Sequence, residues 1–171
     1  MFRLVGLLCF TLGMGLIGVL KSIKLKEREK LLEDFLQIVL MLKGEINYFR
    51  EPLTSLFKKI SKNGDTKGFQ LLSNILYEIT EKDAEIAQIW PEITNYTYKD
   101  TPLKNEDIEI IKFLGTFIGQ TDYENQISQF NYIEKKLNAA IEDAKSCYRI
   151  KGPLYRRLGF FIGAIISIVF L

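Results

Sequence analysis

The apolar residues of this chain form two kinds of pattern: uncharged runs near both ends and helical spacing between them. The first run covers residues 4–20, which are seventeen positions without a charge, and the last covers residues 158–171, which are fourteen. As helices they would measure about 25 Å and about 21 Å, against about 30 Å for the hydrocarbon core of a bilayer. We expect both to cross a membrane, because a small domain could hardly cover every face of such helices.

Each run also has an alternative interpretation. The first could be a secretory signal peptide, although no A-x-A-like cleavage site precedes the charged stretch KSIKLKEREK. The last could be a buried core helix, since apolar segments of this length often are. Arg156 and Arg157 favour a span, because their long side chains can reach the lipid headgroups, and Tyr155 suits the interface.

Basic residues flank the inner side of both runs. They are Lys21, Lys24, Lys26, Arg28 and Lys30 after the first, and Lys145, Arg149, Lys151, Arg156 and Arg157 before the last. Positive residues favour the cytoplasmic side, so both flanks predict the same orientation. We therefore expect an N-terminal transmembrane helix at 4–20, a cytoplasmic helical domain at 21–153 and a C-terminal transmembrane helix at 154–171.

Helical periodicity dominates the middle of the chain. Apolar residues recur in steps of three and four along a first seam, at Leu32, Phe35, Val39, Leu42, Ile46 and Phe49. Shorter apolar faces follow, separated by Pro52, by the turn-forming SKNGDT and by Gly119, and Gly152-Pro153 should break the last helix. The pattern predicts an all-α fold, an antiparallel bundle of about six helices between the two transmembrane helices.

The residues that usually carry catalysis are scarce. The chain has no histidine, and its two cysteines, Cys9 and Cys147, form no C-x-x-C pair. Without a P-loop or a nucleophile motif, we expect no enzyme activity, no cofactor and no bound metal. The net charge of +2 gives little reason to expect nucleic-acid binding.

One glycine pattern imitates a dinucleotide fingerprint. Gly13, Gly15 and Gly18 spell G-x-G-x-x-G, and Glu33 and Asp34 follow at the expected distance. The pattern lies inside an apolar run rather than after a strand, so we expect helix packing instead. The predicted partners in that packing are Gly159 and Gly163 of the last run, which form G-x-x-x-G.

Acidic residues gather in the second half of the middle segment. Between positions 78 and 109 only three lysines oppose nine acids, which are Glu78, Glu81, Asp83, Glu85, Glu92, Asp100, Glu106, Asp107 and Glu109. A solvated face would explain them. A docking surface for a basic partner is the functional alternative.

Three segments together resemble the stage III sporulation protein AB family. They are GEINYFREPLTSLFKKI with Glu45, Tyr48 and Pro52; FLGTFIGQTDYENQ with Leu114, Gly115, Gly119, Asp122 and Gln126; and LYRRLGFFIGAIISIVFL with Tyr155, Gly159 and Gly163. Their order, the chain length and the apolar ends match along essentially the whole chain. Ile118 departs from the leucine expected in an LG-x-x-LG pattern, which preserves the bulk of the side chain.

This resemblance implies a membrane component of the channel that links mother cell and forespore, at the mother-cell side of the cell membrane. Its central domain is expected to look like the cytoplasmic domain of the type II secretion platform protein F. By that analogy it contacts a cytoplasmic secretion-type ATPase, the stage III sporulation protein AA, and other channel subunits, with homo-oligomers possible.

The predicted partner surface is an acid-rich corner. It comprises Glu106, Asp107, Glu109, Gly119, Asp122, Glu124 and Gln126, although Thr121 and Glu124 also fit a T-x-x-E capping box. A small holin-like pore former is the alternative function, which would put the activity in the two apolar ends. A membrane-tethered enzyme is a further alternative that the motifs disfavour.

Overall fold

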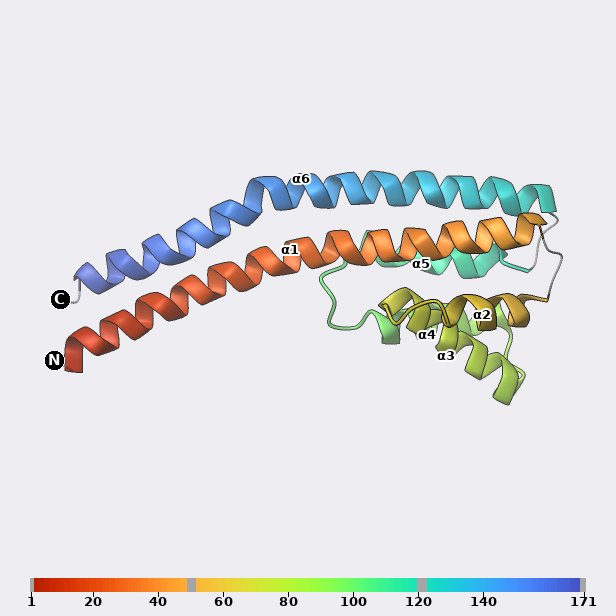
Figure 1. Cartoon of the computed structure of the whole chain (residues 1–171), viewed down its shortest axis with the longest axis horizontal. Coiled ribbons are helices and arrows are strands. Elements are labelled where there is room, and N and C mark those ends of the chain that lie inside the picture. Colours follow the sequence, from red (N-terminus) through yellow and green to blue (C-terminus); the bar gives the residue numbers. More distant parts are fainter. Residues whose placement is uncertain (1, 49–51, 120–122, 170–171) are drawn as a thin grey trace. The chain divides into compact units, whose positions relative to one another are not determined.

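A computed structural model describes residues 2–48, 52–119 and 123–169 of the chain. Within these ranges the secondary structure consists of helices, without a strand, as the apolar periodicity predicts. The six helices are α1 (Phe2–Tyr48), α2 (Leu53–Ser61), α3 (Lys67–Lys82), α4 (Ile86–Thr97), α5 (Asn105–Phe117) and α6 (Tyr123–Val169) (Figure 1). The all-α class is thus confirmed.

The two flanking transmembrane helices are a wrong prediction. Among the described residues, no helix combines the length and the apolar character that crossing a membrane requires. The apolar runs are parts of α1 and α6, two helices of 47 residues each whose remaining lengths are rich in charged side chains. Seventeen and fourteen uncharged positions fall short of the roughly 20 that a spanning helix needs.

The expected helix break at Gly152-Pro153 is also wrong, because α6 continues through Pro153. A proline inside a helix removes one backbone donor and costs about 3 kcal/mol. The close surroundings of Gly152, which is buried beside the Tyr148 ring and the Ser22 hydroxyl, keep the helix packed at this point.

The chain forms two compact units, and both long helices contribute to each. Unit 1 combines Met1–Glu29 with Glu142–Leu171, and unit 2 is Lys30–Ile141. These divisions fall inside α1 and α6, whereas the sequence placed its boundaries at residues 21 and 153.

The core of unit 2 is built from the apolar seam of α1 and the inward faces of the shorter helices. Its large, fully buried side chains include Leu32, Phe35, Leu42, Leu56, Phe57, Ile60, Leu72, Ile75, Trp90 and Phe130. Burying a side chain of this size contributes about 1.5–3 kcal/mol, so this core supplies the main driving force for folding of the unit. The predicted α1 seam is therefore confirmed at Leu32, Phe35, Val39 and Leu42.

Trp90 joins three of these helices. Its indole Nε1 donates a hydrogen bond of 2.9 Å to the backbone carbonyl of Ile111 on α5. Its ring centroid lies 6.1 Å from that of Phe57 on α2. Gly115 faces the indole so closely that an added Cβ would collide with the ring. The absence of a side chain at position 115 is thus what allows α5 to pack against Trp90.

Aromatic rings and one ion pair fix α6 inside unit 2. Phe117 and Phe130 meet edge to face at 5.3 Å, and Phe113 and Tyr132 at 5.7 Å. Such pairs add about 0.5–1.5 kcal/mol beyond the area that they bury. The Lys43 ammonium of α1 also lies 2.7 Å from the Glu134 carboxylate of α6.

Gly115→Ala tests the packing around Trp90. The added methyl group should force the indole or α5 to move, lowering the free energy of unfolding by about 1–3 kcal/mol. Denaturant unfolding measures the difference. Gly44→Ala is the matched control, because nothing lies within 4 Å of an added Cβ there, and it should be neutral or stabilising by up to about 1 kcal/mol. Equal effects of the two substitutions would contradict the packing argument.

Candidate functional site

The predicted acidic corner begins at the first turn of α5, where one of its three acids is buried. The Asp107 carboxylate accepts a 2.8 Å hydrogen bond from the backbone N–H of Lys104, and its side chain is almost fully enclosed. A carboxylate in the first turn satisfies a free donor and interacts favourably with the helix dipole. Asp107 therefore fixes the start of α5 and does not offer its charge to a partner.

Glu106 and Glu109 remain at the surface of the same helix. Both are exposed, and the Glu109 carboxylate lies 2.8 Å from the Lys112 ammonium one turn further along. Exposed pairs of this kind are worth less than about 1 kcal/mol, so the lysine holds Glu109 only weakly. The two glutamates thus present negative charge on a helix whose first turn Asp107 holds in place.

The other members of the predicted corner lie at the opposite end of α5. Gly119 follows the helix with φ of 79°, a left-handed conformation that glycine adopts without strain, and Leu53 occupies the space where a Cβ would stand. Gln126 is buried, whereas Glu124 in the first turn of α6 is exposed. Asp122 lies outside the described residues, as does Thr121.

The structure consequently separates the predicted corner into two groups. Thirteen positions from Glu106 to Gly119 correspond to about 20 Å along a helix. Glu106 and Glu109, near the start of the helix, form the α5 acidic pair, whereas Gly119 follows α5 and Glu124 lies in the first turn of α6. The two groups do not form one patch.

The glycines singled out in unit 1 lie on facing surfaces of α1 and α6. An added Cβ on Gly159 would lie 3.2 Å from the Cα of Gly18, and one on Gly163 would lie 2.9 Å from the Cα of Thr11. Gly15 meets only the Phe160 ring, and Gly13 faces open space. Gly18, Gly159 and Gly163 therefore allow the two backbones to approach, whereas Gly13 takes no part.

Sequence reasoning missed a hydroxyl pair at the same contact. The Thr11 and Ser167 hydroxyl oxygens are 2.7 Å apart, and the Thr11 and Ser167 hydroxyls also donate to the Leu7 carbonyl at 2.9 Å and 3.1 Å. The signal was present, since Ser167 follows Gly163 by four residues and so shares its helix face.

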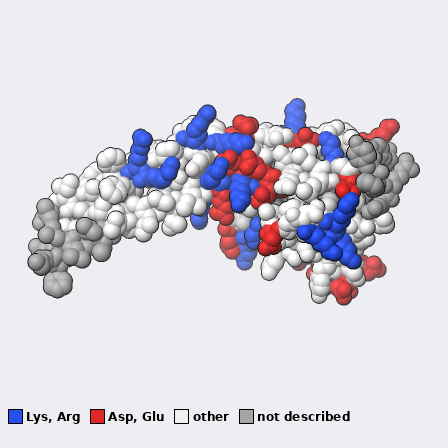
Figure 2. Space-filling view, in the orientation of Figure 1, with Lys and Arg blue, Asp and Glu red and all other residues white. Residues whose placement is uncertain are grey.

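Unit 1 carries many exposed apolar side chains. They include Leu12, Leu16, Ile17, Leu20, Ile23, Ile150, Leu154, Phe160, Phe161, Ile165 and Ile168. Figure 2 shows some lysines and arginines but few acidic residues on this part of the chain, on the face in view. Exposed apolar side chains in such number typically mark an interaction site.

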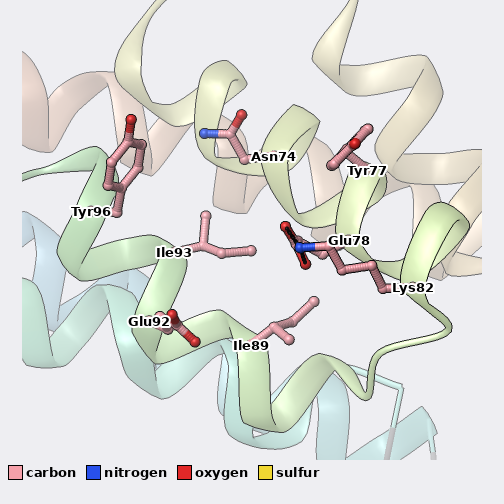
Figure 3. A pocket seen from close by; sticks show the side chains of 8 residues that line it. All are labelled: Asn74, Tyr77, Glu78, Lys82, Ile89, Glu92, Ile93 and Tyr96. Carbon is pink, nitrogen blue, oxygen red and sulfur yellow. Dashed lines mark hydrogen bonds and ion pairs between the residues drawn. The ribbon is translucent and has the colours of Figure 1, made fainter.

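A groove between α3 and α4 in unit 2 was not predicted. It has a volume of about 420 Å³ and is lined by Asn74, Tyr77, Glu78, Lys82, Ile89, Glu92, Ile93 and Tyr96 (Figure 3). Volumes of this order are typical of sites that hold small ligands or a few side chains. Two of its residues, Glu78 and Glu92, are among the nine acids that the sequence pointed to, but the aromatic walls were not recognised.

Two titratable groups, the half-buried Asp34 of α1 and the buried Tyr98 at the end of α4, interact electrostatically. Burial raises the pKa of the Asp34 carboxyl, an effect that Lys30 reduces and Glu33 reinforces. The pKa of Tyr98 is also raised, first by burial and then by the Asp34 charge, and its hydroxyl has no hydrogen-bond partner among the described residues. The ionised form of Asp34 is therefore less favoured in the folded unit than in a fully solvated carboxyl.

An engineered disulfide tests the contact in unit 1. In a chain with Cys9→Ser and Cys147→Ser, Thr11→Cys combined with Ser167→Cys should form a disulfide on mild oxidation, since these side chains already touch. Adding Gly159→Leu should reduce its yield several-fold, because the helices can no longer approach. Adding Gly13→Leu should leave the yield unchanged. Counting free thiols gives the yield, and an equal loss with both leucines would refute the contact.

Asp34→Asn tests the half-buried carboxyl through its pH dependence. The raised pKa means that the folded state binds the proton more tightly, so this contribution to stability is complete below about pH 4 and is lost as pH rises through the folded pKa. Asparagine carries no charge at any pH. The variant should melt slightly higher than the wild type near pH 7, since solvent screens a half-buried charge, and no higher near pH 3, as followed by circular dichroism.

Glu81→Gln serves as the control for this experiment, since Glu81 is exposed on α3. It should shift the melting temperature little at either pH. A gain for Asp34→Asn that is the same at both pH values would show that ionisation of Asp34 is not its cause.

Comparison with known proteins identifies one family. The sequence model described as "Stage III sporulation protein AB" matches residues 3–171, which is essentially the whole chain. No curated protein and no solved structure matches it.

Proposed function

Because this chain belongs to the stage III sporulation protein AB family, we propose that it is a docking component, without enzyme activity, of the channel that links mother cell and forespore. The family assigns it a role in stage III sporulation, and hence to a sporulating bacterium. In this proposal the chain works at the mother-cell side of the channel, where it binds a cytoplasmic secretion-type ATPase, the stage III sporulation protein AA, and other channel subunits.

The α5 acidic pair is the observation that carries the docking proposal. Glu106 and Glu109 are exposed, whereas Asp107 beside them is buried and holds the helix start through Lys104. The pair therefore presents its charge from a fixed position, which lowers the entropic cost of binding. A basic patch on the ATPase would be steered towards it electrostatically.

The exposed apolar side chains of unit 1 supply the second contact in this proposal. They would attach the chain to apolar surfaces of the other channel subunits or to a second copy of itself, since burying them is favourable by about 25 cal/mol per Å². The holin-like alternative gives unit 2 no role. The packed core of that unit favours docking instead.

Charge reversal on α5 tests the proposed ATPase contact. Glu106→Lys with Glu109→Lys replaces attraction by repulsion, which should weaken ATPase binding about tenfold or more at low salt, equivalent to about 1.4 kcal/mol. Co-purification of the ATPase with the tagged full-length chain, repeated at several salt concentrations, measures the effect.

The control for this experiment reverses two exposed acids elsewhere, Glu81→Lys with Glu142→Lys. It has the same net charge change and should keep most of the binding. The wild-type interaction should weaken as salt increases, since surface charges are screened. Unchanged co-purification after reversal of Glu106 and Glu109 would remove this surface from the proposal.

A further inference from the structure

Two tyrosines that lie outside the hydrophobic core form two walls of the groove between α3 and α4. Tyr77 of α3 is 60% exposed and Tyr96 of α4 is 77% exposed. Figure 3 shows them on opposite sides of the groove, with Asn74 between them and Ile93 facing the middle. Exposed tyrosines around a hollow are typical of recognition surfaces, because they offer large contact areas with few rotatable bonds.

The charges of the groove favour a cation. Glu78 is already paired, because its carboxylate lies 2.8 Å from the Lys82 ammonium. Glu92 makes no hydrogen bond or ion pair with any described residue, so its carboxylate is available. The lining therefore holds two carboxylates and one ammonium, and the exposed Asp83 and Glu85 of the adjoining turn add further negative charge.

The charges of Glu78 and Glu92 both act on Lys82. The pKa of Lys82 is raised, first by its hydrogen bond with Glu78, then by the charge of Glu78, and to a smaller extent by Glu92. A second cation between Glu92 and the tyrosine rings would meet the same negative field. The rings themselves attract cations through their faces.

We propose that this groove binds an arginine side chain that a partner protein presents between apolar residues. The planar guanidinium would stack on Tyr96 or Tyr77 and pair with the Glu92 carboxylate through two parallel hydrogen bonds. The aliphatic stem and the neighbouring apolar residues would cover Ile89 and Ile93. Lysine suits the groove less well, because an ammonium neither stacks on a ring nor forms a forked pair.

This proposal concerns a surface that shares no residue with the α5 acidic pair. It therefore does not depend on the ATPase contact, and it specifies the chemistry of the partner rather than its identity. A protein that carries both surfaces could hold two partners at once, or one partner at two points.

Peptide binding to the full-length chain tests the proposal directly. The probe is an acetylated hexapeptide with one arginine between two leucines, labelled with an uncharged fluorophore and followed by fluorescence anisotropy. In two further versions of the peptide, lysine or citrulline replaces the arginine. The citrulline version keeps the shape but lacks the charge, so it should bind at least about tenfold more weakly than the arginine version. The lysine version should have an intermediate affinity.

Variants of the chain locate the binding. Glu92→Gln should weaken binding of the arginine peptide about tenfold, and Tyr96→Ala about fivefold, whereas Tyr96→Phe should keep it because the ring face remains. Glu81→Gln is the matched control, an exposed acid on α3 outside the lining, and should change the affinity less than twofold. Circular dichroism melting confirms that each variant is folded.

Three results would overturn the proposal. The first is equal binding of the arginine and citrulline peptides. The second is an effect of Glu92→Gln no larger than that of Glu81→Gln. The third is no binding of the arginine peptide at concentrations up to about 1 mM, the affinity expected when one charged pair and one stacked ring act alone.

Discussion

The contact between Trp90 and Gly115 is the constraint on which unit 2 depends. The indole takes the place of a side chain on α5, donates its hydrogen to the Ile111 carbonyl and meets the Phe57 ring of α2. It thereby sets the position of α4 relative to two neighbours. Because α4 supplies one wall of the groove and α5 carries Glu106 and Glu109, both proposed interaction surfaces inherit their geometry from this buried contact.

The local sequence pattern was sufficient to predict the helices, but not where each helix ends or how deeply each side chain is buried. The spacing of Leu32, Phe35, Val39 and Leu42 predicts the buried face of α1, because the 3.6-residue period shows directly in sequence. It could not separate Asp107 from Glu106 and Glu109. All three are acids within four positions, and only the packed core decides which of them turns inward.

The remaining differences arise from long-range packing. The α3–α4 groove joins positions 74–82 to positions 89–96, and their approach depends on the turn at Asp83, whose φ of 50° is unusual for a residue other than glycine. The continuation of α6 through Pro153 likewise depends on surroundings that residue preferences do not contain. The apolar runs led to the membrane prediction because their composition shows directly that they are hydrophobic. Whether they are long enough to span a bilayer is a separate condition.

The position of Trp90 also gives the molecule a natural optical reporter. It is the only tryptophan of the chain, it belongs to unit 2, and its indole is buried with the N–H bonded to a carbonyl. The fluorescence of the indole, excited selectively, therefore follows the unfolding of unit 2 alone, whereas circular dichroism records the helices of both units. Comparing the two signals during unfolding would show whether the units open together or in sequence, without any label.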